Sequence, residues 1–138
     1  MEISTQYVIS LEIRGFDITE QEINSLMQLH ATEFYDESCS KNRSMKTADN
    51  IWLHNLWIYE KCIDYSDFDI SCKNFFEEIG NITNIMSRYN QISDARIHLF
   101  VNSDMAQLHI PISKQLIYWL NYYDLEMDVN IISGGLVV

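Results

Sequence analysis

Three segments of this chain alternate apolar and polar residues strictly enough to indicate β-strands with a single buried face. The apolar positions are Tyr7, Ile9, Leu11 and Ile13 in the first segment, Ile97, Leu99 and Val101 in the second, and Leu125, Met127, Val129 and Ile131 in the third. Charged residues such as Glu12, Arg96 and Asp128 occupy the intervening positions. Because burying an unpaired charge is strongly unfavourable, one face of the sheet is expected to stay polar. That favours an antiparallel or mixed sheet over a parallel sheet covered on both faces.

A fourth strand and three helices are expected around these segments. Residues 51–60 are expected to form a strand, and both of its faces are largely apolar, which suits a central position in the sheet. Thr19 followed by Glu22 has the signature of a capping box that opens a helix running to about Leu29. Apolar residues recur at helical spacing through 69–89 and predict one long helix.

The remaining segments complete the predicted fold. Ser113 is positioned to cap a third helix, whereas 30–50 has no period and is expected to be a long irregular loop. We therefore predict a single α+β domain over residues 1–138. It has a sheet of about four strands, largely antiparallel or mixed, and three helices packed mainly on one face.

The charge of the chain limits its partners. The 138 residues include 20 Asp and Glu against 9 Lys and Arg, for a formal net charge of -11. Such a surface repels nucleic acid and anionic membranes and speeds encounter with basic proteins. The alternative is that the charge serves only solubility.

The cysteines and the first residues indicate a compartment. Cys39, Cys62 and Cys72 are odd in number, and 1–13 lacks the basic and apolar regions of a secretory signal. Nor does any stretch approach the roughly 20 apolar residues of a membrane span. A cytoplasmic protein with free thiols is expected.

Two stretches resemble a known family. Tyr7–Leu29 (YVISLEIRGFDITEQEINSLMQL) is similar to the opening strand, Asp-rich turn and capped helix of the bacterial family called domain of unknown function 4279. Leu108–Ile132 (LHIPISKQLIYWLNYYDLEMDVNII) resembles that family's end, and Trp52–Trp57 resembles its Trp-bearing strand; together they cover about two fifths of the chain. Loop 30–50 departs from the pattern, since it lacks a glycine-rich turn. The resemblance implies an α+β fold without established enzymatic activity, in small cytosolic proteins of which some are encoded near polymorphic toxins.

Neither metal nor nucleophile chemistry has a strong signature here. The four histidines form none of the short-spaced pairs typical of zinc sites; they are His30, His54, His98 and His109. No metal or other cofactor is predicted. Cys72 falls on an apolar helical stripe and is expected in the core, while Cys62 beside Lys61 is a weak candidate thiolate.

The polar strand positions support a second hypothesis, a small enzyme that uses Glu12, His98, Glu126 and Asp128. Paired carboxylates can act as acid and base where their environments differ. An open sheet face, however, is expected to leave these side chains solvated, which disfavours catalysis. A third hypothesis is a ligand-binding module with a pocket between the sheet and the helices.

The first hypothesis is a non-catalytic interaction protein for a basic partner. Six carboxylates lie between residues 60 and 78 with only Lys61 and Lys73 as cations: Glu60, Asp64, Asp67, Asp69, Glu77 and Glu78. They are the predicted partner-binding residues, against the alternative of a merely solvated loop and helix face. The most specific form of this hypothesis is an immunity protein that neutralises a cognate basic toxin, for example a nuclease used in contact-dependent growth inhibition. A nuclease carries a positive groove for phosphates, and an acidic protein can cover that groove.

Overall fold

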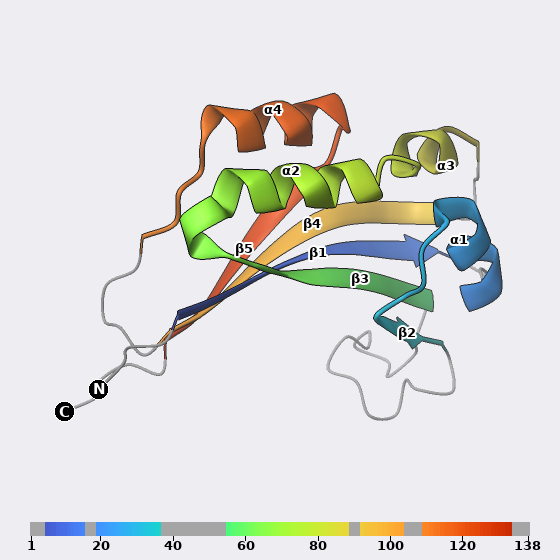
Figure 1. Ribbon diagram of the computed structural model, residues 1–138. Coiled ribbons are helices and arrows are strands. Elements are labelled where there is room, and N and C mark those ends of the chain that lie inside the picture. Colours follow the sequence, from blue (N-terminus) through green and yellow to red (C-terminus); the bar gives the residue numbers. More distant parts are fainter. Residues whose placement is uncertain (1–4, 16–18, 37–54, 89–91, 104–108, 134–138) are drawn as a thin grey trace.

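The structure is a computed structural model that describes residues 5–15, 19–36, 55–88, 92–103 and 109–133. The elements in chain order are β1 (Thr5–Gly15), α1 (Glu20–Met27), β2 (Glu33–Tyr35), β3 (Asn55–Ile63), the 3-10 turn η2 (Tyr65–Asp67), α2 (Phe68–Glu78), α3 (Ile82–Arg88), β4 (Ile92–Ser103), α4 (Lys114–Tyr122) and β5 (Glu126–Ser133) (Figure 1). The predicted α+β class is confirmed, although the described residues hold five strands rather than four and four α-helices rather than three.

All five strands belong to one mixed sheet with the order β2-β3-β1-β4-β5. β1 lies at its centre and pairs antiparallel with both β3 and β4. β2 pairs antiparallel with β3, and β5 runs parallel to β4 after the crossover through α4. β3 therefore lies inside the sheet between β2 and β1, as its apolar faces predict, and it ends at Ile63 rather than at Glu60. Of the predicted strand 51–60, residues 51–54 lie outside the described part of the chain.

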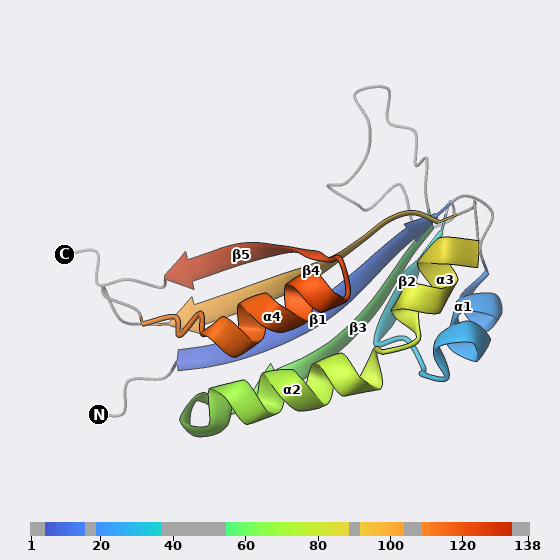
Figure 2. The same cartoon turned by 90° about the horizontal axis from the view of Figure 1, so that it is seen from above.

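The hydrophobic core lies between the sheet and the helices. The alternating residues Tyr7, Ile9, Leu11 and Ile13 are all at most 4% exposed, which confirms the predicted face of β1. They join buried residues from α1, α2, α3 and α4 in a single cluster. The helices thus cover one face of the sheet (Figures 1 and 2). The alternation of the strands directs the polar positions of β1, β4 and β5 to the opposite face.

The predicted capping residues begin their helices. Thr19 has extended backbone, and its Oγ1 accepts a hydrogen bond from Glu22 N at 3.1 Å, while the same hydroxyl donates to Glu22 Oε1. Ser113 caps α4 by accepting from Leu116 N at 3.1 Å. Each cap satisfies a backbone N–H that the helix cannot pair internally.

The prediction of one long helix through 69–89 is wrong, because the helix ends at Glu78 and α3 starts at Ile82. Between them Gly80 N donates to Glu77 O at 3.3 Å and Ile82 N to Ile79 O at 3.0 Å, so the chain tightens into three-residue turns. Glycine favours such an interruption, since it costs about 1 kcal/mol in a helix relative to Ala. The break rotates the following residues. Ile85 is buried, while Met86, expected in the core, is 40% exposed.

The predicted irregular loop 30–50 contains a strand. β2 spans only Glu33–Tyr35 and pairs with β3, where Phe34 is opposite Trp57. A strand of three residues is too short to show an alternation of apolar and polar residues. Pairing with β3 stabilises its extended conformation, and that pairing is not visible in the local sequence. The rest of that segment from residue 37 lies outside the described residues.

Candidate functional site

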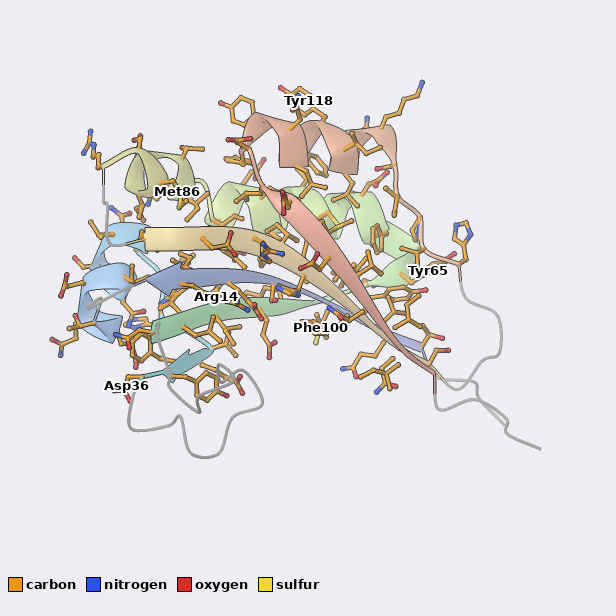
Figure 3. The ribbon with its side chains drawn as sticks, turned by 180° about the vertical axis from the view of Figure 1, so that it is seen from behind. Arg14, Asp36, Tyr65, Met86, Phe100 and Tyr118 are labelled. Atoms are coloured by element: carbon orange, nitrogen blue, oxygen red, sulfur yellow. The ribbon has the colours of Figure 1, made fainter. Side chains whose placement is uncertain are left out.

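Charged side chains from three strands gather on the sheet face opposite the helices, the face seen in Figure 3. The β1–β4 register puts Ser10 beside His98 and Glu12 beside Arg96. The parallel β4–β5 register puts His98 beside Asp128 and Arg96 beside Glu126. The fold therefore brings together the predicted group Glu12, His98, Glu126 and Asp128. We name the full set the sheet-face cluster: Ser10, Glu12, Arg14, Asp94, Arg96, His98, Glu126 and Asp128.

Arg96 is shared by three carboxylates of this cluster. Its Nε lies 2.9 Å from Asp94 Oδ2, its Nη1 2.9 Å from Asp128 Oδ2, and its Nη2 3.7 Å from Glu126 Oε2. The hydrogen bond from Arg96 lowers the pKa of Asp128, and the hydrogen bonds to Asp94 and Asp128 raise the pKa of Arg96. Arg96 thus ties β4 to β5. Sequence reasoning missed this role, because only the strand order reveals which carboxylates it meets.

Glu12 and His98 are the most buried ionisable residues of the cluster. Their side chains are 11% and 13% exposed, so the expected solvated face is wrong at this point. His98 Nε2 lies 2.9 Å from Glu12 Oε2, without the alignment of a hydrogen bond, and Arg14 Nη2 lies 3.8 Å from the same oxygen. The His98 ring also stacks on Phe100, with the two centroids 5.7 Å apart.

A serine completes the cluster. Ser10 is fully buried, and its Oγ has no hydrogen-bond partner among the described residues. Serine, histidine and glutamate thus follow one another across β1 and β4, which is a set of groups found in acyl-transfer enzymes. Because solvent does not reach Ser10, a substrate would not reach its hydroxyl either. The arrangement is suited to holding β1 and β4 together through the contact of Glu12 with His98.

Three predicted partner-binding residues lie at the start of α2. Asp64, Asp67 and Asp69 are all exposed. Asp64 Oδ1 accepts from Ser66 N at 3.1 Å and caps η2, whereas Asp69 Oδ1 accepts from Ser113 Oγ at 2.7 Å and links α2 to α4. Asp67 is the N-cap residue of α2 but makes no side-chain capping bond.

The other three predicted residues are divided between two faces. Glu77 and Glu78 are exposed at the end of α2, where Glu77 lies 4.0 Å from Lys73 and Glu78 accepts a hydrogen bond from the Tyr59 hydroxyl. Burial, with Glu78 adding to it, raises the pKa of Tyr59. Glu60 points to the opposite sheet face, since it alternates with Tyr59, and burial together with Glu33 raises its pKa. Five of the six residues therefore belong to the helix side of the molecule.

The outer face of α4 adds exposed aromatic and apolar groups to the helix side. Ile117, Tyr118 and Tyr122 are 55%, 61% and 64% exposed, and the two tyrosine rings stack with centroids 6.0 Å apart. Figure 3 shows Tyr118 projecting from α4 away from the sheet. Tyr122 lies at the surface, whereas Tyr123 is only partly exposed and stacks on Phe76. Tyrosine is a frequent anchor residue at protein interfaces.

The described residues line cavities outside the main core. One of about 320 Å³ lies where η2 enters α2, between Tyr65, Asp69 and Pro111, and one of about 150 Å³ lies between α1 and α3. By contrast, the space beneath α1, bordered by Ile13 and Trp57, leaves no room for a water molecule. The pocket expected between sheet and helices is therefore filled by side chains at that point.

The cysteines and acidic groups give no sign of other chemistry in the described part of the chain. Cys72 is fully buried, and burial, with the nearby Asp69 carboxylate, raises its pKa to about 12. Cys62 is exposed, and Cys39 lies outside the described residues. Within those residues there is no group of three or more His, Cys, Asp or Glu side chains placed to hold a metal. None of the helices described is both long and apolar enough to cross a membrane.

Comparison of the chain with protein-family models, curated proteins and solved structures gives no match. The resemblance of Tyr7–Leu29 and Leu108–Ile132 to the domain-of-unknown-function 4279 family stays a prediction.

Proposed function

We propose that this protein is a non-catalytic interaction protein that binds a basic protein partner through the outer surface of α2 and α4. Its most specific form is a cytoplasmic immunity protein that binds and neutralises a cognate basic bacterial toxin. Five exposed carboxylates, on α2 and on the turn that precedes it, lie on the same side of the molecule as the exposed tyrosines of α4. This juxtaposition is the observation that carries the proposal. We name this surface the helix-layer surface: Asp64, Asp67, Asp69, Glu77, Glu78, Ile117, Tyr118 and Tyr122.

The two helices present this surface together. The hydrogen bond from Ser113 Oγ to Asp69 Oδ1 holds the start of α4 against the start of α2, and the two helices lie next to each other above the sheet in Figure 1. A centre of large apolar and aromatic groups with charged groups around it is the usual anatomy of a specific interface. Between Asp64 and Glu78, all charged residues are acidic except Lys73.

The net charge of -11 supports the same partner class. An excess of carboxylates accelerates encounter with a positively charged protein, and salt weakens that steering. A toxin that cleaves nucleic acid needs a positive groove for phosphates, and an acidic protein can occupy that groove in place of the substrate.

The test uses two charge-reversal variants that change the net charge equally. One carries Asp67→Lys and Glu77→Lys on the helix-layer surface, and the control carries Glu20→Lys and Glu33→Lys on α1 and β2. The probe is the purified protein encoded beside this chain, with association followed by surface plasmon resonance at low and physiological salt. We expect the first variant to associate about tenfold more slowly and to lose most of the salt dependence, and the control to change much less. Equal effects in the two variants, or absence of binding at either salt concentration, would contradict the proposal.

The sheet-face cluster supports a second candidate, a small enzyme, because Glu12 and His98 meet at 2.9 Å in a partly buried setting. Glu12→Gln and His98→Gln variants separate the two candidates. If the cluster is catalytic, hydrolysis of a panel of ester, phosphate and glycoside model substrates is lost in both. If the protein acts by binding, neither variant alters the association rate with the partner.

A further inference from the structure

The outer edge of the sheet at β5 has the properties of a strand that accepts another strand. β5 spans eight residues, Glu126–Ser133, and is the last strand in the sheet order. In the described part of the chain it pairs with β4 alone, and Figure 2 shows its other edge at the outside of the sheet. No described residue pairs with its outer backbone groups.

Natural sheets protect such edges by short strands, lysine, proline or bulges. The opposite edge follows this rule, because β2 has only three residues. β5 does not, since it contains neither lysine, proline nor glycine, and it pairs with β4 without a register shift. The carboxylates of Glu126 and Asp128 disfavour pairing with another acidic strand, but a long regular edge of this kind suits strand addition by a basic partner segment.

Apolar side chains are exposed on both faces of this edge strand. Val129 and Ile131, on the helix side, are 38% and 52% exposed, and Ile132, on the opposite side, is 62% exposed. An added strand would cover them with its own alternate side chains.

The charges of the strand select the occupant. On the face opposite the helices β5 carries Glu126 and Asp128, whose nearest cation, Arg96, is shared with Asp94. One cation among three carboxylates leaves a negative surplus. A second copy of β5 would add the same charges to this edge, whereas an extended segment with basic residues at alternate positions would complement them.

We infer that β5 binds an extended basic segment of the partner by strand addition, with Lys or Arg beside Glu126 and Asp128 and apolar residues beside Val129 and Ile131. This inference rests on the proposed function for the class of partner. It adds a second contact region at the far edge of the sheet, distinct from the helix-layer surface.

The probe is an acetylated and amidated peptide of alternating Lys and Val, as long as the eight residues of β5. Two control peptides are an alternating Glu and Val peptide and the Lys peptide with N-methyl groups on one edge. Binding is followed by amide chemical shifts and hydrogen exchange of the intact protein. We expect shifts concentrated in β5 and exchange of its outer amides slowed about tenfold by the Lys peptide alone. Shifts confined to α2 and α4 would overturn the inference, as would equal binding of the N-methylated peptide.

Lysine substitutions locate the site on the protein. Ile131→Lys and Ile132→Lys introduce the residue that protects natural edges. Met86→Lys and Ile70→Lys, at positions 40% and 60% exposed on α3 and α2, introduce the same charge elsewhere. We expect the β5 variants to raise the Kd of the Lys peptide about tenfold and the controls less than about threefold. An equal rise of the Kd in the β5 variants and in the control variants would show a general charge effect and overturn the inference.

Two further measurements keep this inference separate from the proposed function. If the partner binds with sensitivity to Asp67→Lys and Glu77→Lys but not to Ile131→Lys, the proposed function holds and strand addition fails. A mass by light scattering that doubles with concentration, and returns to that of one chain on Ile131→Lys, would show that a second copy occupies the edge and would likewise overturn it.

Discussion

At the scale of single residues, the Arg96–Asp128 contact makes stability depend on pH. The hydrogen bond from Arg96 lowers the folded-state pKa of Asp128 below its unfolded value of about 3.9. The contact therefore stabilises the protein above that unfolded value, and the contribution is lost as the pH falls through the folded pKa.

We predict that Asp128→Asn destabilises the protein at neutral pH and that this difference from the unsubstituted chain shrinks on acidification from about pH 6 to pH 2. Urea unfolding followed by circular dichroism at several pH values measures it. In an Arg96→Gln background the same substitution should have little effect at any of these pH values. A difference that persists at the acid end would contradict the assignment.

The Glu12–His98 contact predicts coupling between two substitutions. Glu12 is 8% exposed and loses its nearest partner in His98→Gln, so the single changes should not add. We expect a coupling of about 1 kcal/mol or more in a double-mutant cycle of Glu12→Gln and His98→Gln, measured by urea unfolding. Glu12→Gln combined with Ser113→Ala, on the other side of the sheet, should be additive within about 0.5 kcal/mol.

These residues also show how far sequence reasoning reaches. Alternation alone placed Glu12 and His98 on the same side of their strands, because side-chain direction in a strand is a local property. It did not predict that they lie 2.9 Å apart in a partly buried setting. That contact depends on which strands pair and on their register, and neither is encoded by a single strand.

At the scale of elements, Ser113 links two helices. Its Oγ accepts from Leu116 N and donates to Asp69 Oδ1, so one hydroxyl caps α4 and holds it to α2. We predict that Ser113→Ala lowers the free energy of unfolding by about 1–2 kcal/mol and that Ser113→Thr, which keeps the hydroxyl, restores most of it. Urea unfolding measures both variants. An equal decrease in the free energy of unfolding in Ser113→Ala and Ser113→Thr would show that the hydroxyl does not stabilise the protein.

Element boundaries were predictable where a local signal exists. Thr19 and Ser113 begin α1 and α4 because their side chains bond backbone groups within the same turn. The end of α2 was missed, because one glycine in a long apolar pattern weakens a helix without requiring a break. A Cβ added at Gly80 would lie near Glu77 O and the Tyr123 hydroxyl. The proximity of Tyr123 depends on the tertiary structure, so the local sequence does not reveal it.

At the scale of the whole molecule, the net charge of -11 should itself oppose folding, since compaction brings like charges together. Raising ionic strength from about 10 mM to about 150 mM shortens the screening length from roughly 30 Å to 8 Å. We predict that the urea midpoint rises over this range, and that it rises less in the Asp67→Lys, Glu77→Lys variant. A midpoint that falls with salt would indicate that attractive ion pairs dominate instead.

The central place of β1 has a consequence for synthesis of the chain. β1 leaves the ribosome first, yet its neighbours β3 and β4 are complete only at Ile63 and Ser103. Both edges of this eleven-residue strand lack a partner until Ile63 has been made, and one edge still lacks its partner until Ser103 has been made. The nascent chain thus carries its central strand in an unprotected form until β4 has been made. Such a segment is the kind that chaperones bind until the later strands arrive.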